Sequence, residues 1–351
     1  MNTRTLILAT ALCISASAEA AVFCVGDSAA LTQALATAGS NAWTDAIRIR
    51  EGTYSAPVGG WTYFPNPSDQ DYYLSITGGW DANCGLQSLD SSLTKLSGGF
   101  ARRVLAVSRG NGSSAELEIS GLSLVNGFSS SQDYETNLGL ALRVYSHAHS
   151  GPLRVENVIV RDNSSLHGLG SVFLSSKGPI YFRNNLVADN DSGNGSMGVT
   201  FVGSGTAYVS NNTIVNNVTL STPSIGMGLD VSGGTGARYL SNNIVWGNAT
   251  FANSWDVDSD PMVLMIGNNI GSMYGTNAAG SSSNTAVDPM FQSPADYRLQ
   301  PGSPLHNAGV NAPLGGLASY DLLGMARILN GVTDVGAYES QMSAIFKNSF
   351  E

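Results

Sequence analysis

Short runs of alternating hydrophobic and polar residues recur along the chain, and four of them read almost alike. They are LRVENVIVRDN (153–163), IYFRNNLVADN (180–190), AYVSNNTIVNN (207–217) and RYLSNNIVWGN (238–248). Alternation with a period of two is typical of a β-strand with one buried face. The first asparagines of successive runs are Asn157, Asn184, Asn211, Asn242 and Asn268, preceded by Gly121. Their spacing of 26 to 36 residues is typical of a solenoid.

A second series of strands precedes these runs. Each opens with glycine, and the four lie at 139–146, 170–176, 198–204 and 228–234. The hydrophobic positions that match in the four strands are Val144, Leu174, Val202 and Val231, and they recur every 28 to 30 residues. Short strands joined by Gly, Ser and Asn turns, without long helical patterns, predict the all-β class. We expect a right-handed parallel β-helix in which each coil pairs with the next.

The asparagine column predicts an asparagine ladder. An inward-pointing Asn at a turn can bond to the amides above and below it, which satisfies a polar group whose unpaired burial costs about 1 to 3 kcal/mol. The alternative, that Asn favours turns, explains single residues but not a fixed register. Hydrophobic residues before each asparagine are then expected to point inward: Leu117 and Ile119, Leu153 and Val155, Ile180 and Phe182, Ala207 and Val209, and Leu264 and Ile266.

The two ends of the chain differ from the repeats. Residues 1–20 have a basic start and a short apolar run, which predict a secretory signal peptide cleaved before Ala21, with Ala16-Ser17-Ala18 as a nearby alternative site. Residues 27–39 combine an initial Asp, hydrophobic residues at helical spacing and a final Gly, which predict an N-terminal capping helix. In the mature chain we expect an N-terminal cap with the first coils at residues 21–100 and the repeats at 101–285. C-terminal coils with a cap follow at 286–340, and a tail at 341–351.

Composition points to an exported protein with a packed core. The formal net charge is −10 and 42% of the residues are hydrophobic, so we expect neither nucleic acid nor an anionic membrane as a partner. No segment after the signal peptide has the length and hydrophobicity of an integral membrane span. Cys13 lies in the signal peptide, which leaves Cys24 and Cys84. In an exported chain this pair predicts a disulfide, with two buried free thiols as the alternative.

The C-terminal region resembles a known family. The segments DYRLQPGSPLHNAG and DLLGMARILNGVTDVGAYE are similar to the C-terminal region of the choice-of-anchor Q group of bacterial right-handed β-helix proteins. The matching residues are Asp321, Gly324, Arg327, Gly331, Asp334, Gly336, Ala337, Tyr338 and Glu339. The resemblance implies a cell-surface context and no shared reaction. The final SQMSAIFKNSFE is similar to the endings of some exported proteins of Gram-negative bacteria, which implies recognition by a sorting system, with a frayed tail as the alternative.

Candidate catalytic chemistry is sparse. A polysaccharide lyase needs a base beside a cation that neutralises the sugar carboxylate, and the chain has only three lysines, one of them Lys95. Asp162 and Asp189 lie one coil apart in one column, where solvated turn residues are favoured over a hydrolytic pair. The stretch WDVDSDP (255–261) resembles the start of a calcium loop but lacks the glycine and the closing acidic residue. We therefore predict no catalytic residues, no metal site and no cofactor, with calcium as the alternative.

Two outward columns are more suggestive. One contains Glu118, Arg154, Tyr181, Tyr208, Tyr239 and Met265, and the other contains Arg143, Phe173, Phe201 and Asp230. Aromatic strips on a rigid surface can stack against sugar rings or another protein. The alternative is that stacked rings only reinforce neighbouring coils.

These observations favour a binding or adhesion protein. We predict a secreted or cell-surface protein whose partner is a glycan or a cell surface. The ligand-binding residues are expected to be Tyr181, Tyr208, Tyr239 and Arg154. One alternative is a polysaccharide lyase or glycoside hydrolase that acts on an extracellular polysaccharide. Another is a passive structural protein of the envelope.

Overall fold

The computed structural model describes ten segments of the chain: 20–41, 43–65, 71–109, 112–131, 137–146, 148–166, 170–193, 198–219, 226–249 and 253–340. The expected signal peptide lies outside the described residues except for its last position, and the tail 341–351 lies outside them entirely. In the part of the chain that the structure describes, no helix has the length and hydrophobicity needed to span a membrane.

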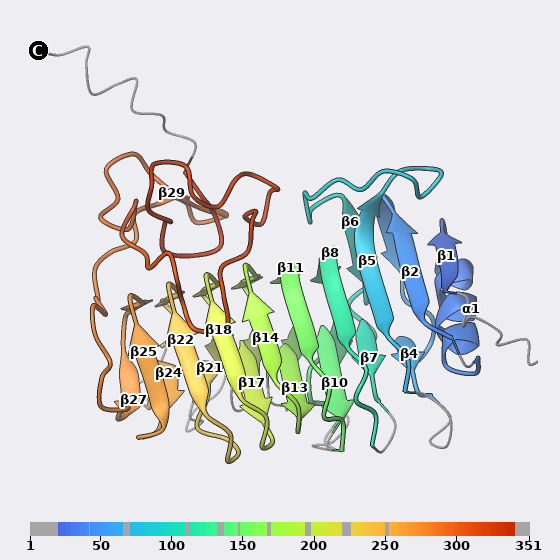
Figure 1. The fold of residues 1–351 in the computed structure, drawn as a ribbon, viewed down its shortest axis with the longest axis horizontal. Coiled ribbons are helices and arrows are strands. Elements are labelled where there is room, and N and C mark those ends of the chain that lie inside the picture. Colours follow the sequence, from blue (N-terminus) through green and yellow to red (C-terminus); the bar gives the residue numbers. More distant parts are fainter. Residues whose placement is uncertain are drawn as a thin grey trace, which may run out of the picture.

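Parallel strands of successive coils form the walls of a right-handed β-helix, which confirms the predicted fold class (Figure 1). The 15-stranded sheet, here sheet A, contains a main row and a second row of strands. The main row is β1 (Ala21–Val25), β2 (Asp45–Arg50), β5 (Leu74–Trp80), β8 (Leu117–Val125), β11 (Leu153–Arg161), β14 (Ile180–Arg183), β18 (Ala207–Ser210), β22 (Arg238–Ser241) and β25 (Val263–Ile266). The second row is β3 (Gly52–Ser55), β6 (Thr94–Ser97), β15 (Leu186–Ala188), β19 (Thr213–Val215), β23 (Ile244–Trp246) and β26 (Asn269–Ile270).

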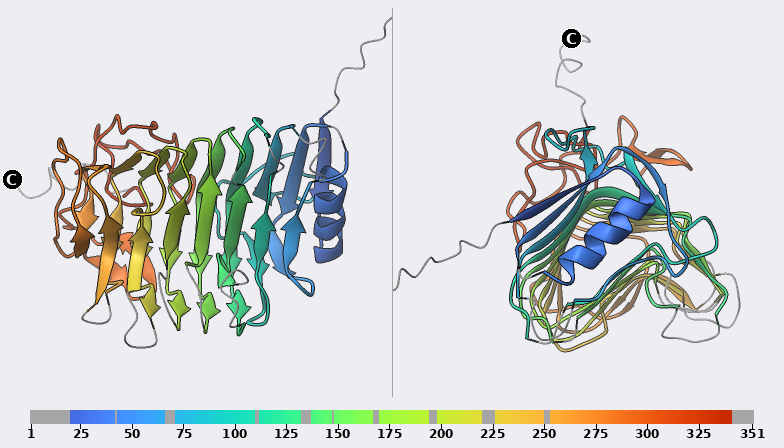
Figure 2. Two further views of the ribbon diagram at one scale, coloured as in Figure 1. Left: turned by 90° about the horizontal axis from the view of Figure 1, so that it is seen from below. Right: turned by 90° about the vertical axis from the view of Figure 1, so that its right-hand side faces the viewer.

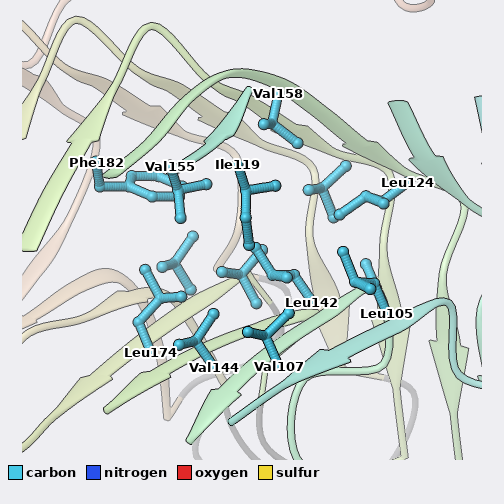
Figure 3. Close-up of a cluster of buried hydrophobic side chains, with 14 of the residues drawn as sticks. Leu105, Val107, Ile119, Leu124, Leu142, Val144, Val155, Val158, Leu174 and Phe182 are labelled. Atoms are coloured by element: carbon cyan, nitrogen blue, oxygen red, sulfur yellow. The ribbon is translucent and has the colours of Figure 1, made fainter. Parts of the chain in front are cut away.

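Two further parallel sheets close each coil. The eight-stranded sheet B consists of β4 (Trp61–Tyr63), β7 (Leu105–Val107), β10 (Leu142–Ser146), β13 (Val172–Ser176), β17 (Val199–Val202), β21 (Gly226–Asp230), β24 (Ser254–Ser259) and β27 (Met273–Gly275). The four-stranded sheet C consists of β9 (Phe128–Ser129), β12 (Ser164–Ser165), β16 (Asp191–Ser192) and β20 (Val218–Thr219). Inward side chains of sheets A and B interdigitate between them, as Val155 and Phe182 do with Val144 and Leu174 in Figure 3. The hydrophobic core therefore runs along the axis of the solenoid.

The N-terminal end of the core is covered by helix α1 (Ser28–Ala38), as Figure 2 shows. Asp27 caps the helix by accepting the Ala30 N–H at 2.8 Å. The buried face of the helix consists of Leu31, Ala34, Leu35 and Ala38. The predicted capping helix is confirmed, although the sequence analysis did not recognise strand β1 before it. Cys24 in β1 and Cys84 after β5 form the predicted disulfide, with a sequence separation of 60 residues.

The predicted asparagine ladder is present, but of the five predicted members only Asn268 belongs to it. The predicted members Asn157, Asn184, Asn211 and Asn242 are stacked in register and have φ angles of 53° to 57°. They occupy the left-handed bend between the two rows of sheet A, which Asn tolerates better than most residues. The inward ladder consists of Asn185, Asn212, Asn243, Asn268 and Asn284, joined by Nδ2–Oδ1 hydrogen bonds of 2.8 to 3.0 Å. Assigning Asn157, Asn184, Asn211 and Asn242 to the ladder was wrong, because the bend at each of them reverses the alternation of side chains. The assignment of Asn268 was correct, because Gly267 takes the bend in that coil.

A second ladder follows the second row of sheet A. It consists of Asn163, Asn190, Asn217, Asn248 and Asp256, joined at 2.7 to 2.9 Å. The residues before it also have positive φ, including Asp162 at 57° and Asp189 at 55°. The interpretation of Asp162 and Asp189 as turn residues is therefore confirmed.

At two positions the residue that points outward differs by one from the predicted residue. In the last coil Gly267 takes the bend, so Val263 and Met265 point inward and Leu264 stands in the outward column. The assignment of Met265 to that column was wrong. On sheet B, Phe201 pairs with Leu174 and is fully buried in the core, so its outward assignment was also wrong. In both strands consecutive hydrophobic residues make the alternation ambiguous.

Residues 288–340 fold back along the flank of the solenoid, where the sequence analysis expected further coils and an end cap (Figure 1). This C-terminal segment contains the antiparallel strands β28 (Phe291–Ser293) and β29 (Asp296–Leu299). Its side chains Tyr297, Leu322 and Val335 join Val215 and Ile244 of sheet A in a second hydrophobic cluster. The stacked asparagines of the bend hold it: their Nδ2 groups donate to the carbonyls of Tyr320 at 2.7 Å, Asp334 at 3.2 Å and Val310 at 2.9 Å.

Candidate functional site

The predicted ligand-binding residues lie together on the outer face of sheet A. Tyr181, Tyr208 and Tyr239 come from β14, β18 and β22 and are register partners. Each occupies the second position of a strand whose first and third residues point into the core, so the pleat turns the rings outward. Arg154 of β11 is the register partner of Tyr181. We call these four side chains the tyrosine stack.

The ring geometry limits how the tyrosine stack can contact a ligand. Centroids lie 5.1 Å apart between Tyr181 and Tyr208 and 5.4 Å apart between Tyr208 and Tyr239, with interplanar angles of 17° and 21°. The Arg154 guanidinium carbon lies 4.3 Å from the Tyr181 ring centroid. The inner ring faces are thus occupied by neighbours in the stack, as the alternative interpretation expected. Ring edges and phenol hydroxyls remain for an external partner.

Charged groups border the stack on one side. Arg154 Nε lies 2.9 Å from Glu116 Oε1, and Arg154 Nη1 lies 3.4 Å from Glu156 Oε1. Partial burial opposes the charge of Arg154, but these two carboxylates raise its pKa above the ordinary value. Burial, followed by the two neighbouring phenols, raises the pKa of Tyr208. The stack therefore presents neutral hydroxyls next to a fixed cation.

The C-terminal segment limits access to the middle of the stack. Gly315 has a φ of 89°, and a Cβ at this position would lie 2.5 Å from Tyr208 Cβ. Its carbonyl accepts a hydrogen bond from Arg183 Nη1 at 2.9 Å. Only glycine allows such a close approach of the backbone. All three tyrosines are half-buried, and at Tyr208 the C-terminal segment is part of the cover.

A groove of about 420 Å³ lies between the solenoid and the C-terminal segment. Its lining includes Lys95 of β6, Arg161 and Asp162 at the end of β11, and Tyr297 of β29. Arg161 Nη2 lies 2.6 Å from Asp189 Oδ2, and the Tyr297 hydroxyl donates to Asp189 Oδ1 at 2.5 Å. Burial and the nearby Asp189 raise the pKa of Asp162, although Arg161 opposes them. Sequence reasoning missed this groove because one of its walls is more than 100 residues away along the chain.

The residues that carry the family resemblance stabilise the C-terminal segment. The Asp321 carboxylate accepts the N–H groups of Met325 at 2.7 Å and Glu339 at 2.9 Å. Asp334 accepts the N–H groups of Asn307 and Ser340, each at 2.7 Å. Buried Arg327 donates to the carbonyl of Gly336. These residues have a structural role as hydrogen-bond anchors.

Burial raises the pKa of Glu339 to about 7. Its carboxylate accepts the Asp334 N–H at 3.0 Å, an interaction that favours the ionised form and opposes the effect of burial. Together with Asp321 and Asp334, Glu339 borders a cavity of about 340 Å³.

The acidic residues of 255–261 do not converge. Asp256 points inward and ends the second ladder by accepting Asn248 Nδ2 at 2.9 Å, whereas Asp258 is an outward residue of β24. Among the described residues, no group of three His, Cys, Asp or Glu side chains is placed to hold a metal ion.

Comparisons with known proteins do not assign the chain to a family. No protein-family model matches the chain, and no curated protein matches it. Among solved structures, the crystal structure of pectate lyase Pel9A is similar with a TM-score of 0.40 and 16% identity, over 92% of this chain and 97% of that chain. The assignment of the β-helix stands on the strand pairing described above.

Proposed function

We propose that this protein is an exported binding or adhesion protein that contacts a glycan or a cell surface through the tyrosine stack. The supporting observation is the alignment of four side chains from four consecutive coils in one file. Because adjacent strands are about 4.8 Å apart, the three hydroxyls repeat at a regular spacing along a rigid surface. A polymer with regularly spaced polar groups is a suitable ligand for such a row. The Arg154 guanidinium at one end supplies a charged hydrogen-bond donor.

The proposed location outside the cytoplasm has separate support. The Cys24–Cys84 disulfide is typical of an oxidising compartment. The signal peptide expected in residues 1–20 and the choice-of-anchor Q resemblance of the C-terminal region agree with export and surface display. The protein would thus meet extracellular glycans.

The triple variant Tyr181→Phe/Tyr208→Phe/Tyr239→Phe tests the stack. It keeps the stacked rings but removes the three hydroxyls, each worth about 1 kcal/mol if it bonds to ligand, so we expect roughly a hundredfold loss of affinity. Glycan-array screening of the mature chain, followed by titration calorimetry on a bound glycan, measures the change. Tyr320→Phe is the matched control. Tyr320 lies outside the stack and is 48% exposed, and its backbone carbonyl, which accepts from Asn184 Nδ2, is unchanged by the substitution. Full affinity in the triple variant would refute the proposal.

The groove supports a second candidate function, a polysaccharide lyase or glycoside hydrolase. The observation in its favour is that Lys95, Arg161 and Asp162 line the same concavity, which offers a base, a cation and a carboxyl with a raised pKa. Incubation with uronate and neutral polysaccharides would then release reducing ends or unsaturated products. We expect Lys95→Ala to lower that rate by about a hundredfold or more without a change in melting temperature. Absence of products with all polysaccharides would exclude this candidate and leave the binding proposal intact.

A further inference from the structure

The last coils of sheet B carry a polar and aromatic column that is separate from the tyrosine stack. Thr200 of β17, Asp230 of β21, Asp258 of β24 and Tyr274 of β27 are successive register partners. Side chains that share a register and a face lie about 4.8 Å from one another along the sheet. The column continues the predicted outward positions Arg143 and Phe173, and of the four residues named here only Asp230 was predicted to lie in it.

A single hydroxyl group connects the two carboxyl groups. Ser232 Oγ lies 2.9 Å from Asp230 Oδ1 and 3.0 Å from Asp258 Oδ2. A hydroxyl has one hydrogen and can donate to only one of the two oxygens. The Ser232 hydroxyl therefore bridges the two carboxyl groups, as a donor that lies within hydrogen-bond distance of both. The three groups thus form the hydrogen-bonded chain Asp258–Ser232–Asp230.

Backbone groups also bond to the two carboxyls. Asp230 Oδ1 accepts the Ser232 N–H at 3.1 Å, and the Asp258 carboxyl accepts a backbone hydrogen bond from Ser259; each interaction opposes the effect of burial on the pKa of its carboxyl. Burial raises the pKa of both carboxyls, and Asp258 adds to this effect at Asp230. The other charged groups that act on the pair are Arg238, which opposes the rise at Asp230, and Asp260, which adds to the rise at Asp258. Each carboxyl thus has one backbone partner and shares the Ser232 hydroxyl.

Tyr274 differs from the tyrosines of sheet A because it has no coil beyond it. It is 53% exposed, and its ring centroid lies 4.7 Å from that of Trp255 at an interplanar angle of 40°. β27 is the terminal strand of sheet B, so the ring face away from Trp255 is not covered by a following strand. An open aromatic face next to hydrogen-bonding groups is suited to a sugar ring, whose faces are apolar and whose rim is polar.

The opposite end of the column has an unused polar group. Thr200 is 2% exposed, and its Oγ1 has no hydrogen-bond partner within the described part of the chain. A buried hydroxyl without a partner costs free energy, so its presence beside Asp230 is explained if a ligand or its bound water completes the hydrogen bond.

We propose that Tyr274, Asp258, Ser232 and Asp230 form a binding site for a neutral sugar residue of a glycan. The ring of Tyr274 supplies the platform, Asp230 accepts hydrogen bonds from sugar hydroxyls, and Ser232 with Asp258 completes the polar rim. The negative charge of Asp230 and the nearby Asp260 disfavours acidic sugars. This site lies on a different sheet from the tyrosine stack and does not depend on it.

The test uses the mature full-length chain carrying the triple Tyr→Phe substitution at positions 181, 208 and 239, so that binding at the stack does not contribute. On an array of neutral and acidic oligosaccharides, we expect neutral glycans to bind to this background. Tyr274→Ala should then lower the affinity by roughly tenfold or more, as expected for loss of an aromatic platform. Tyr320→Ala, which removes another exposed tyrosine ring, should leave the affinity unchanged.

Two substitutions at one position test the role of Asp258 in the polar rim. Asp258→Asn keeps a polar group of the same shape that can hydrogen-bond to Ser232, so we expect its affinity to stay within about threefold of the background. Asp258→Ala removes the group and should weaken binding about as much as Tyr274→Ala. Circular dichroism checks that each variant is folded. The proposal is overturned if the folded background binds no neutral glycan, or if Tyr274→Ala and Asp258→Ala both bind as tightly as the background.

Discussion

Asn212→Ala is expected to destabilise the protein by about 4 kcal/mol, because it removes a fully buried member of the first ladder. Asn212 Nδ2 donates to Asn243 Oδ1 at 2.8 Å and to the Phe182 carbonyl at 2.9 Å. Its Oδ1 accepts from Asn185 N–H at 2.9 Å and Asn185 Nδ2 at 3.0 Å. Alanine leaves these neighbours in an interior without water, where each unsatisfied group costs about 1 to 3 kcal/mol. Urea denaturation followed by circular dichroism measures the loss.

The preceding residue provides the matched control. Asn211 has a φ of 54°, its Nδ2 donates to the Asp334 carbonyl at 3.2 Å, and its Oδ1 accepts from Asn242 Nδ2 at 3.3 Å. In Asn211→Gly the loss of these two long contacts is partly offset because glycine adopts the left-handed conformation without strain, so we expect a change of about 1 kcal/mol. If the two variants were equally unstable, the assignment of the ladder to the second asparagine of each pair would be incorrect.

Val215→Asp is expected to detach the C-terminal segment from the solenoid and to cost about 4 to 5 kcal/mol. Val215 lies on the outer face of β19, yet it is fully buried in the cluster with Leu322 and Val335. An aspartate there either carries an uncompensated charge or must be protonated, and both are costly in an apolar environment. Limited proteolysis should cleave residues 288–340 in the variant under conditions that leave the wild-type chain intact.

Val125→Asp is the corresponding control because it occupies the same outward column. The register runs from Val125 through Arg161 and Ala188 to Val215. Val125 borders the groove and is half-exposed, so an aspartate there stays hydrated and we expect a change of about 0.5 kcal/mol or less. Equal resistance of both variants to proteolysis would contradict the proposed role of the cluster in holding the segment.

The tyrosine stack shows how a solenoid builds a surface from repetition. A register that is strictly kept for the buried residues is kept for the outward ones as well. Tyr181, Tyr208 and Tyr239 are therefore aligned by the packing of their inward neighbours, such as Phe182 and Val209. Substitutions in the core that shift one coil are expected to disturb the stack too, because both depend on the same strand pairing.

Particular residues show how far sequence reasoning reached. The capping helix, the disulfide and the in-register tyrosines were all predicted, since each depends on local spacing or on the repeat itself. Asn184, Asn211 and Asn242 were each assigned to the ladder in place of the asparagine that follows, because two adjacent asparagines fit the same repeat and only the backbone bend at the first one separates them. The exchange of Met265 for Leu264 follows from the same ambiguity, with Gly267 in place of the asparagine.

The repeat in the sequence determined the β-helix, because hydrophobic alternation and period depend only on neighbouring residues and on identical coils stacking upon one another. Tertiary structure alone decided where residues 288–340 dock, which side chains share the groove, and that Asp230, Ser232, Asp258 and Tyr274 meet on sheet B. Some of these contacts involve segments that lie outside the repeat. Others bring residues of successive coils into one column although loops of different length make their spacing in the sequence irregular. One signal was present in LVA, TIV and IVW, whose continuous hydrophobic character is typical of strands buried on both faces. This hydrophobic character does not show which segment covers the outer face of the strands. The covering segment is residues 288–340, which are far from these strands in the sequence.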